Sequence, residues 1–213
     1  MTATDAMPRP DIAAAITLIA ITDDLRDGID GLAARAAGAV RGGATMIQVR
    51  LKHADARTLA AVARRLVADL PVPVVINDRL DVALATGAAG VHVGVDDLPL
   101  EAVRRLVPND FIVGASFGSE AELAAARGAD YVGIGPVYAS GSKPDAGVAI
   151  GPDGLRRLRA LIDSPSVGIG GVTPDNARAV IDAGAVGVAV IASVFGHADP
   201  EAAARAIRAA IAR

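Results

Sequence analysis

Short apolar segments alternate with longer amphipathic segments along almost the whole chain. The apolar segments are rich in β-branched residues and lack a polar face, which is typical of parallel strands covered on both sides. We expect eight strands, at about residues 16–21, 45–49, 73–77, 90–93, 111–115, 130–134, 166–169 and 186–191.

The segments between these strands have helical spacing. Leu59, Val62 and Leu66 lie on one helical face, as do Leu155 and Leu158. Strands that alternate with helices to the end of the chain predict an α/β fold, a single (β/α)₈ TIM barrel. In such a barrel, the residues that follow each strand gather at one mouth.

A weak internal repeat supports the count of strands. Residues 42–49, 87–94, 128–135 and 184–191 resemble one another, and each begins with Gly just before a predicted strand. Glycine tolerates the left-handed conformation that commonly ends a helix. The repeat therefore indicates a recurring helix–turn–strand unit.

The length of 213 residues suits one domain, and no linker divides the chain. We expect the barrel to span residues 16–213. Residues 1–15 contain prolines and aspartates and lack the basic start and apolar region of a signal peptide, so we expect a disordered arm. The longest connection, residues 135–151, is rich in Gly, Ser and Pro, and loops of this length are usually functional or disordered.

Composition limits the kinds of molecule that the chain is expected to bind. Aromatic residues make up only 2% and the net charge is −3, which argues against nucleic-acid binding. No apolar run approaches the roughly 20 residues of a membrane span. The chain has no Cys, which excludes disulfides and permits the cytoplasmic location that we expect. The sequence leaves open whether the chain forms a homo-oligomer.

Polar residues follow the second predicted strand. Gln48, Arg50 and Lys52 point the same way if the strand geometry persists. Two cations and an amide suit a phosphorylated or polar ring substrate. A solvated strand end followed by an exposed Lys is the alternative, and this segment alone does not decide between them.

Two aspartates follow neighbouring predicted strands. Asn77 and Asp78 end the third strand, and Asp97 follows the fourth. Each is also a favoured helix cap. Two carboxylates at adjacent strand ends can share one Mg²⁺, which completes its shell with water and substrate phosphates.

The remaining candidates suit phosphate binding. Ser116 follows the fifth strand, residues 140–143 (Ser-Gly-Ser-Lys) lie in the long loop, and Gly170-Gly171 follows the seventh strand. The alternative for Ser116 is an ordinary serine in a turn, and the alternative for residues 140–143 is a flexible linker. The loops after strands seven and eight are a recurrent phosphate site of this fold. We interpret His92, inside a strand, as a packed barrel residue.

Eight short motifs, one for each barrel loop, together resemble the thiamine-phosphate synthase family over roughly residues 16–207. They are ITDD (21–24), IQVRLK (47–52), INDRLDVA (76–83), GVHVGVDD (90–97), VGAS (113–116), GADYVGIGPVYASGSK (128–143), GIGGVTPDN (168–176) and AGAVGVAVI (183–191).

This resemblance implies an Mg²⁺-dependent transferase. The family joins a hydroxymethylpyrimidine diphosphate to a thiazole phosphate and releases diphosphate. Its mechanism is dissociative: diphosphate leaves first, and the thiazole nitrogen captures a pyrimidine-stabilised cation. Such a step needs a cationic clamp where charge develops rather than a strong base.

The resemblance also implies roles for individual residues. The pyrimidine diphosphate would be bound by Gln48, Val49, Arg50, Leu51, Lys52, Asn77, Ser116 and Lys143. The thiazole phosphate would be bound by Ser140, Gly141, Ser142, Gly171, Ile191 and Ala192. Asp78 and Asp97 would ligate Mg²⁺, and Arg50, Ser116 and Lys143 would be catalytic.

Some positions depart from the family pattern. Ala192 replaces a usual Ser, which removes a hydrogen bond worth ~1 kcal/mol. Val95 replaces a common Gln, and Ser140 and Ser142 replace threonines. Two alternatives share the barrel: a thiazole tautomerase-like relative, which uses a His just after the fifth strand, and a non-catalytic barrel that binds a phosphorylated thiazole. Phe117-Gly118 occupies the position of that His.

Overall fold

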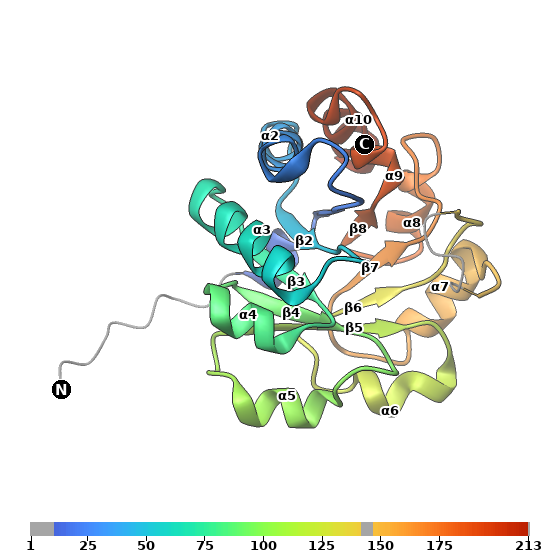
Figure 1. The fold of residues 1–213 in the computed structure, drawn as a ribbon. Helices are drawn as coiled ribbons and strands as arrows, with labels where there is room; N and C mark the ends of the chain where they lie inside the picture. Colours follow the sequence, from blue (N-terminus) through green and yellow to red (C-terminus); the bar gives the residue numbers. More distant parts are fainter. Residues whose placement is uncertain (1–10, 142–146, 213) are drawn as a thin grey trace.

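The eight apolar segments form the wall of a closed barrel (Figure 1). The computed structural model describes residues 11–141 and 147–212. Within them, eight strands pair in chain order, all parallel, and the last pairs with the first. The strands are β1 (Leu18–Ile21), β2 (Met46–Val49), β3 (Val74–Asn77), β4 (Gly90–Val93), β5 (Ile112–Phe117), β6 (Tyr131–Ile134), β7 (Ser166–Ile169) and β8 (Gly187–Val190). This confirms the predicted fold class.

Helices ring the barrel (Figure 1). Among the described residues, no helix is long and apolar enough to cross a bilayer. The helices are α1 (Ile12–Ala15), α2 (Gly28–Arg41), α3 (Ala56–Asp69), α4 (Leu80–Thr86), α5 (Leu100–Leu106), the 3₁₀-helix η1 (Glu120–Glu122), α6 (Leu123–Ala126), α7 (Gly151–Arg159), α8 (Ala177–Asp182), α9 (Ala192–Phe195) and α10 (Pro200–Ala212).

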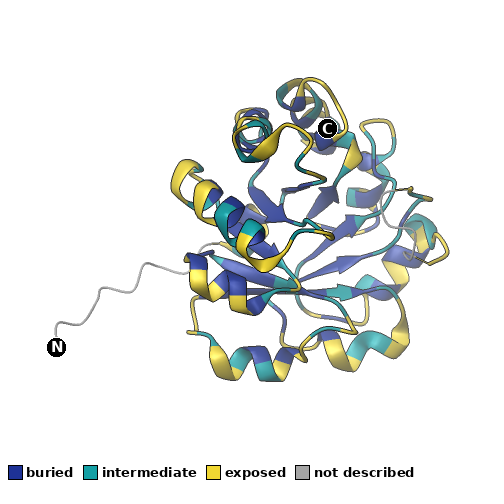
Figure 2. Ribbon diagram, viewed as in Figure 1, coloured by how far each residue is buried: buried dark blue, intermediate teal, exposed yellow. Residues whose placement is uncertain are grey.

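Most strands contribute to two apolar layers, which explains their continuous apolar sequences. In β1, Leu18 and Ala20 pack outward against the helices, whereas Ile19 and Ile21 pack inside the barrel. The strands are accordingly buried while the outer faces of the helices are exposed (Figure 2). Because both strand faces are covered, the barrel interior is a packed core, and space for a ligand is left only near one end.

The internal repeat corresponds to a repeated turn. One glycine in each segment adopts positive φ and precedes a buried Ala: Gly43, Gly87, Gly128 and Gly184, followed by Ala44, Ala88, Ala129 and Ala185. Gly87, for example, is the left-handed C-cap of α4. The predicted helix–turn–strand unit is therefore confirmed.

The expected N-terminal arm needs a correction. Residues 1–10 lie outside the described part of the chain, but residues 12–15 form helix α1, which Asp11 caps by accepting from the Ala13 amide at 3.0 Å. Ala15 and the following Ile16 are buried and pack with the inner core of the barrel. A disordered arm is therefore wrong for residues 11–15, where apolar contact with the barrel interior stabilises a helix.

Candidate active site

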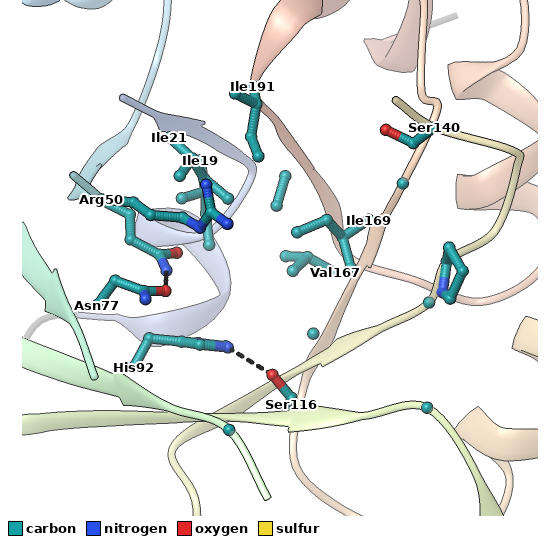
Figure 3. Close-up of a pocket in the computed structure, with 18 of the residues that line it drawn as sticks. Ile19, Ile21, Arg50, Asn77, His92, Ser116, Ser140, Val167, Ile169 and Ile191 are labelled. Carbon is teal, nitrogen blue, oxygen red and sulfur yellow. Dashed lines mark hydrogen bonds between the residues drawn. The ribbon is translucent and has the colours of Figure 1, made fainter. Parts of the chain in front are cut away.

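The carboxyl ends of the strands surround a cavity of about 520 Å³. All eight strands contribute to its lining, and its floor is the apolar inner core of the barrel. Figure 3 shows Arg50, Asn77 and His92 on one side of this cavity and Ser140 across from them. A cavity of this size is in the range of small-molecule sites.

Most of the residues predicted to bind substrate or metal line this one cavity. They are Gln48, Arg50, Lys52, Asn77, Asp78, Asp97, Ser116, Ser140, Gly171, Ile191 and Ala192. Val49 and Leu51 do not line it: Val49 is fully buried in the outer core, and Leu51 packs against the same core. Gly141 is described but does not line the cavity either. Ser142 and Lys143 lie outside the described residues.

An amide pair joins the ends of β2 and β3. Gln48 Nε2 donates to Asn77 Oδ1 at 2.8 Å, and Gln48 is only 4% exposed. This bond fixes the orientation of both amides. Gln48 Oε1 and Asn77 Nδ2 then present one acceptor and one donor, which can recognise a flat ring with complementary edge groups.

Arg50 carries a buried nitrogen without a partner. Its Nη2 makes no hydrogen bond to any part of the chain that the structure describes. Thr22 fixes the backbone beneath it: the Arg50 amide donates to Thr22 Oγ1 at 2.8 Å, and that hydroxyl donates to the Arg50 carbonyl at 3.1 Å. A buried guanidinium N–H that lacks an acceptor, held on a fixed backbone and facing a cavity, suits an anionic ligand.

Asp78 and Asp97 lie at the same cavity, from the ends of neighbouring strands. Asp78 has a φ of 64°, and its amide donates to the His92 carbonyl at 2.8 Å. Left-handed backbone at a residue other than Gly stores strain and is found preferentially at functional sites. Asp97 Oδ2 accepts from the Gly94 amide at 2.7 Å, which orients the carboxylate and leaves its second oxygen to bind a ligand.

A grouping of three or more His, Asp or Glu side chains with metal-binding geometry is absent from the described residues. Two carboxylates nevertheless fit Mg²⁺, because this ion keeps several waters and takes its remaining ligands from substrate phosphates. The donor set therefore fits Mg²⁺ better than a metal that requires a complete protein shell.

Ser116 is hydrogen-bonded to a histidine inside the barrel. His92 Nε2 lies 3.3 Å from Ser116 Oγ (Figure 3). On its other side, His92 Nδ1 lies 3.1 Å from the Tyr131 hydroxyl. His92 lies within the barrel, as predicted, but its contact with Ser116 and the presence of Tyr131 were not predicted. Strand alternation could have placed both side chains inside, whereas their contact depends on the register between strands.

The opposite rim is built from backbone. Gly170 and Gly171 have φ values of 94° and 61°, and a Cβ on Gly171 would lie 2.5 Å from the Ala139 carbonyl oxygen. Only glycine fits there, so the backbone after β7 closely approaches the start of the long loop. The Tyr138 amide donates to the Gly170 carbonyl at 2.9 Å and anchors that loop to the end of β7.

Glu122 makes a second set of contacts that were not predicted from the sequence. Ser119 and Glu122 have the spacing of a capping box, but Glu122 Oε2 accepts from the Gly118 amide at 2.7 Å, and Ser119 Oγ donates to Oε1 at 3.0 Å. Glu122 thereby fixes the turn directly after Ser116 and lines the cavity.

Comparisons with known proteins agree with this geometry. The model of the family described as thiamine monophosphate synthase matches residues 18–194. The thiamine-phosphate synthase of Moorella thermoacetica is 49% identical over 181 residues, which are 83% of this chain and 86% of the relative. That of Methanoculleus marisnigri is 51% identical over 179 residues, 82% and 85% of the two chains.

A solved structure shows the same likeness in three dimensions. The thiamine phosphate pyrophosphorylase from Pyrococcus furiosus superposes with a TM-score of 0.82 at 35% identity, covering 95% of this chain and 98% of that one. The matched span includes every strand of the barrel and the rim residues described above. The chain therefore belongs to the thiamine monophosphate synthase family.

Proposed function

We propose that the chain is a thiamine-phosphate synthase. It would join 4-amino-2-methyl-5-(diphosphooxymethyl)pyrimidine to 4-methyl-5-(2-phosphooxyethyl)thiazole and release diphosphate. The observation that carries this proposal is the single cavity, with cationic and acidic side chains on one rim and close-packed glycine backbone on the other. Two phosphorylated rings can meet in such a space with their reacting atoms in contact.

The pyrimidine diphosphate would occupy the rim formed by β2, β3 and β5. The donor–acceptor pair of Gln48 and Asn77 suits the amino group and ring nitrogen of an aminopyrimidine. Arg50 and Lys52 would bind the diphosphate, and Arg50 Nη2 would gain the acceptor that it lacks. Val49 and Leu51 would take part only through their backbone, because their side chains pack in or against the outer core.

Asp78 and Asp97 would hold Mg²⁺ beside the diphosphate. When bound, the ion would neutralise charge on the diphosphate as it leaves. Asp97 is already oriented by the Gly94 amide, and Asp78 is held by its own amide bond to the His92 carbonyl. The Asp97 carboxylate and the Asp78 backbone are therefore held by main-chain contacts before any ligand arrives.

The residues in the cavity suit a dissociative transfer. The bond between the pyrimidine methylene carbon and the diphosphate oxygen breaks, and its electron pair leaves with the diphosphate. The thiazole nitrogen then donates its lone pair to the methylene carbon and forms the new C–N bond. Neither step requires a proton to be removed by the protein. Arg50 and Ser116 would stabilise the departing oxygen, as would Lys143 from outside the described residues.

The thiazole phosphate would bind at the opposite rim. Gly171, Ile191 and Ala192 line the cavity there, together with Ser140 from the long loop. The close backbone approach at Gly171 favours contact with phosphate through N–H groups. Roles for Gly141 and Ser142 in this subsite stay predictions.

Incubation with both substrates, with Mg²⁺ or with a chelator, tests the proposal. We expect diphosphate and thiamine phosphate to form in equal amounts, and only with the metal. A tautomerase-like barrel would act on the thiazole alone, and Gly118, at the position of its histidine, opposes that activity. A non-catalytic barrel would bind the thiazole phosphate irrespective of Mg²⁺ and release no diphosphate; either result would refute the synthase. The cytoplasmic location stays a prediction.

A further inference from the structure

Three side chains from three neighbouring strands form a chain of hydrogen bonds that runs from the barrel interior to the cavity. Tyr131 on β6 contacts His92 Nδ1 at 3.1 Å, and His92 Nε2 on β4 contacts Ser116 Oγ on β5 at 3.3 Å. Only Ser116 has been given a role in the reaction above. Behind it, Tyr131 is fully buried and His92 is half-buried, and the reaction described above uses neither side chain.

Glycine at one position makes room for this chain. Gly114 is the register partner of both His92 and Tyr131, on either side of β5. A Cβ there would lie 2.3 Å from the Tyr131 ring and 2.6 Å from its hydroxyl. The phenol ring therefore occupies the space of the missing side chain, and its hydroxyl is held against the imidazole.

Burial decides which way the protons point. Burial raises the pKa of the Tyr131 phenol, so it stays neutral. The hydroxyl is fully buried, and His92 is its hydrogen-bond partner in the described part of the protein. If Nδ1 donated to the hydroxyl, the phenol proton would point into the apolar inner core without an acceptor.

The other arrangement satisfies every proton. The Tyr131 hydroxyl donates to Nδ1, and this bond places the imidazole proton on Nε2, because each tautomer is set by the bond made at the other nitrogen. Nε2–H then donates to Ser116 Oγ. With its oxygen accepting from His92, the serine hydroxyl directs its own proton into the cavity.

We propose that Tyr131 and His92 are positioning residues for the transfer, which together turn the Ser116 hydroxyl into a donor toward the departing diphosphate. This role rests on the proposed function of the cavity. Without Tyr131, His92 can take the Nδ1–H tautomer, and Nε2 then accepts the serine proton. The hydroxyl that should stabilise the leaving oxygen would instead present its lone pairs to it.

The tautomer can be measured directly by ¹⁵N NMR of the histidine rings, without substrates. The chain has three histidines, and a His92→Asn variant identifies the resonance of His92 by its absence. In the wild type we expect a neutral His92 with the proton on Nε2. In Tyr131→Phe, which keeps the ring and removes the hydroxyl, we expect a substantial share of the Nδ1–H form. A wild-type His92 protonated at Nδ1, or no change in Tyr131→Phe, overturns the proposal.

Kinetics test the consequence for the reaction. Tyr131→Phe should lower kcat roughly fivefold, the effect of about one neutral hydrogen bond, and change KM little. In a Ser116→Ala background the same substitution should have no further effect on kcat, because its influence passes through the serine. An equal loss in both backgrounds would show a merely structural role and refute the proposal.

The matched control is Ser166→Ala, which removes a buried hydroxyl elsewhere in the barrel wall and should leave kcat unchanged in both backgrounds. The two parts of the test separate two failures. If the wild type releases no diphosphate from the two substrates, the proposed function is wrong. If it does, but the NMR and kinetic results above go the other way, only the positioning role is wrong.

Discussion

At the scale of single residues, two buried polar atoms without partners have opposite meanings. Arg50 Nη2 faces the cavity, where an anionic ligand can satisfy it. Ser166 Oγ is buried in the barrel wall away from the cavity and, among the described residues, has no partner either. An unsatisfied donor is useful at a binding site and costs stability elsewhere.

Ser166→Ala should therefore stabilise the protein. The substitution removes an unsatisfied hydroxyl and leaves almost the same volume, so we expect the free energy of unfolding to rise by roughly 1 kcal/mol. Denaturant titration measures this. A loss of stability would mean that the hydroxyl has a partner.

Individual residues also show which parts of the site could be predicted from the sequence and which could not. Gln48, Asn77, Asp78 and Asp97 could be found because each follows an apolar strand, and parallel strands bring their carboxyl ends to one mouth. The hydrogen bond between His92 and Tyr131 could not be found in this way. It depends on the stagger between strands, and no local pattern in a single sequence encodes that stagger.

At the scale of elements, the strands were more predictable than the helix starts. Every predicted strand is found within two residues of its expected bounds, because burial on both faces leaves an unmistakable apolar run. Thr173-Pro174 has the sequence of a helix start, a cap residue before a proline, but it forms a turn, and α8 begins at Ala177. Asn176 Oδ1 accepts from the Thr173 amide at 2.8 Å, so side-chain bonding within the turn outweighs the cap signal.

The turn after β7 provides a test at this scale. Gly171→Ala would place a methyl group 2.5 Å from the Ala139 carbonyl oxygen and displace the start of the long loop. We expect KM for the thiazole phosphate to rise at least tenfold, with a smaller change in KM for the pyrimidine diphosphate.

Gly87→Ala is the matched control. Gly87 has a similar φ of 70°, but a Cβ there would meet nothing within 4 Å. It should cost about 1 kcal/mol of stability, as expected for a left-handed alanine, and leave both KM values unchanged. Equal effects of the two variants on KM would show that backbone strain, and not loop displacement, is responsible.

At the scale of the whole molecule, ion pairs tie the loop after β1 to the ring of helices. Asp23 accepts from Arg26 Nη1 at 2.6 Å and from Arg35 Nη1 at 2.8 Å. Partial burial acts to raise the pKa of Asp23, but hydrogen bonds from Arg26, the Asp24 backbone and Arg35 together outweigh it and hold the pKa below the ordinary value of 3.8. Arg26 Nη2 also donates to the Phe195 carbonyl at 2.7 Å, so the network joins the first and last units of the barrel.

This network predicts the dependence of stability on pH. A carboxyl whose pKa is lower in the folded state stabilises the fold above its unfolded pKa, and the contribution is lost as the pH falls through the folded value. The free energy of unfolding should therefore decline below about pH 4. In Asp23→Asn the value at pH 7 should be lower and the decline smaller. A decline identical to that of the wild type would exclude Asp23 as its source.

The central claim is that Asp78 and Asp97 together hold the metal that assists the departing diphosphate. The most direct measurement is the Mg²⁺ concentration for half-maximal diphosphate release in Asp78→Asn and Asp97→Asn. Asparagine keeps an oxygen for the Gly94 amide while removing the charge of Asp97. Asp81→Asn is the control, since Asp81, in the first turn of α4, is paired with Arg79.

We expect each of the two site variants to require at least tenfold more Mg²⁺ and to reach a lower maximal rate, with the control unchanged. If either variant responded to Mg²⁺ as the wild type does, that carboxylate would not be a ligand and the account of the site would be contradicted.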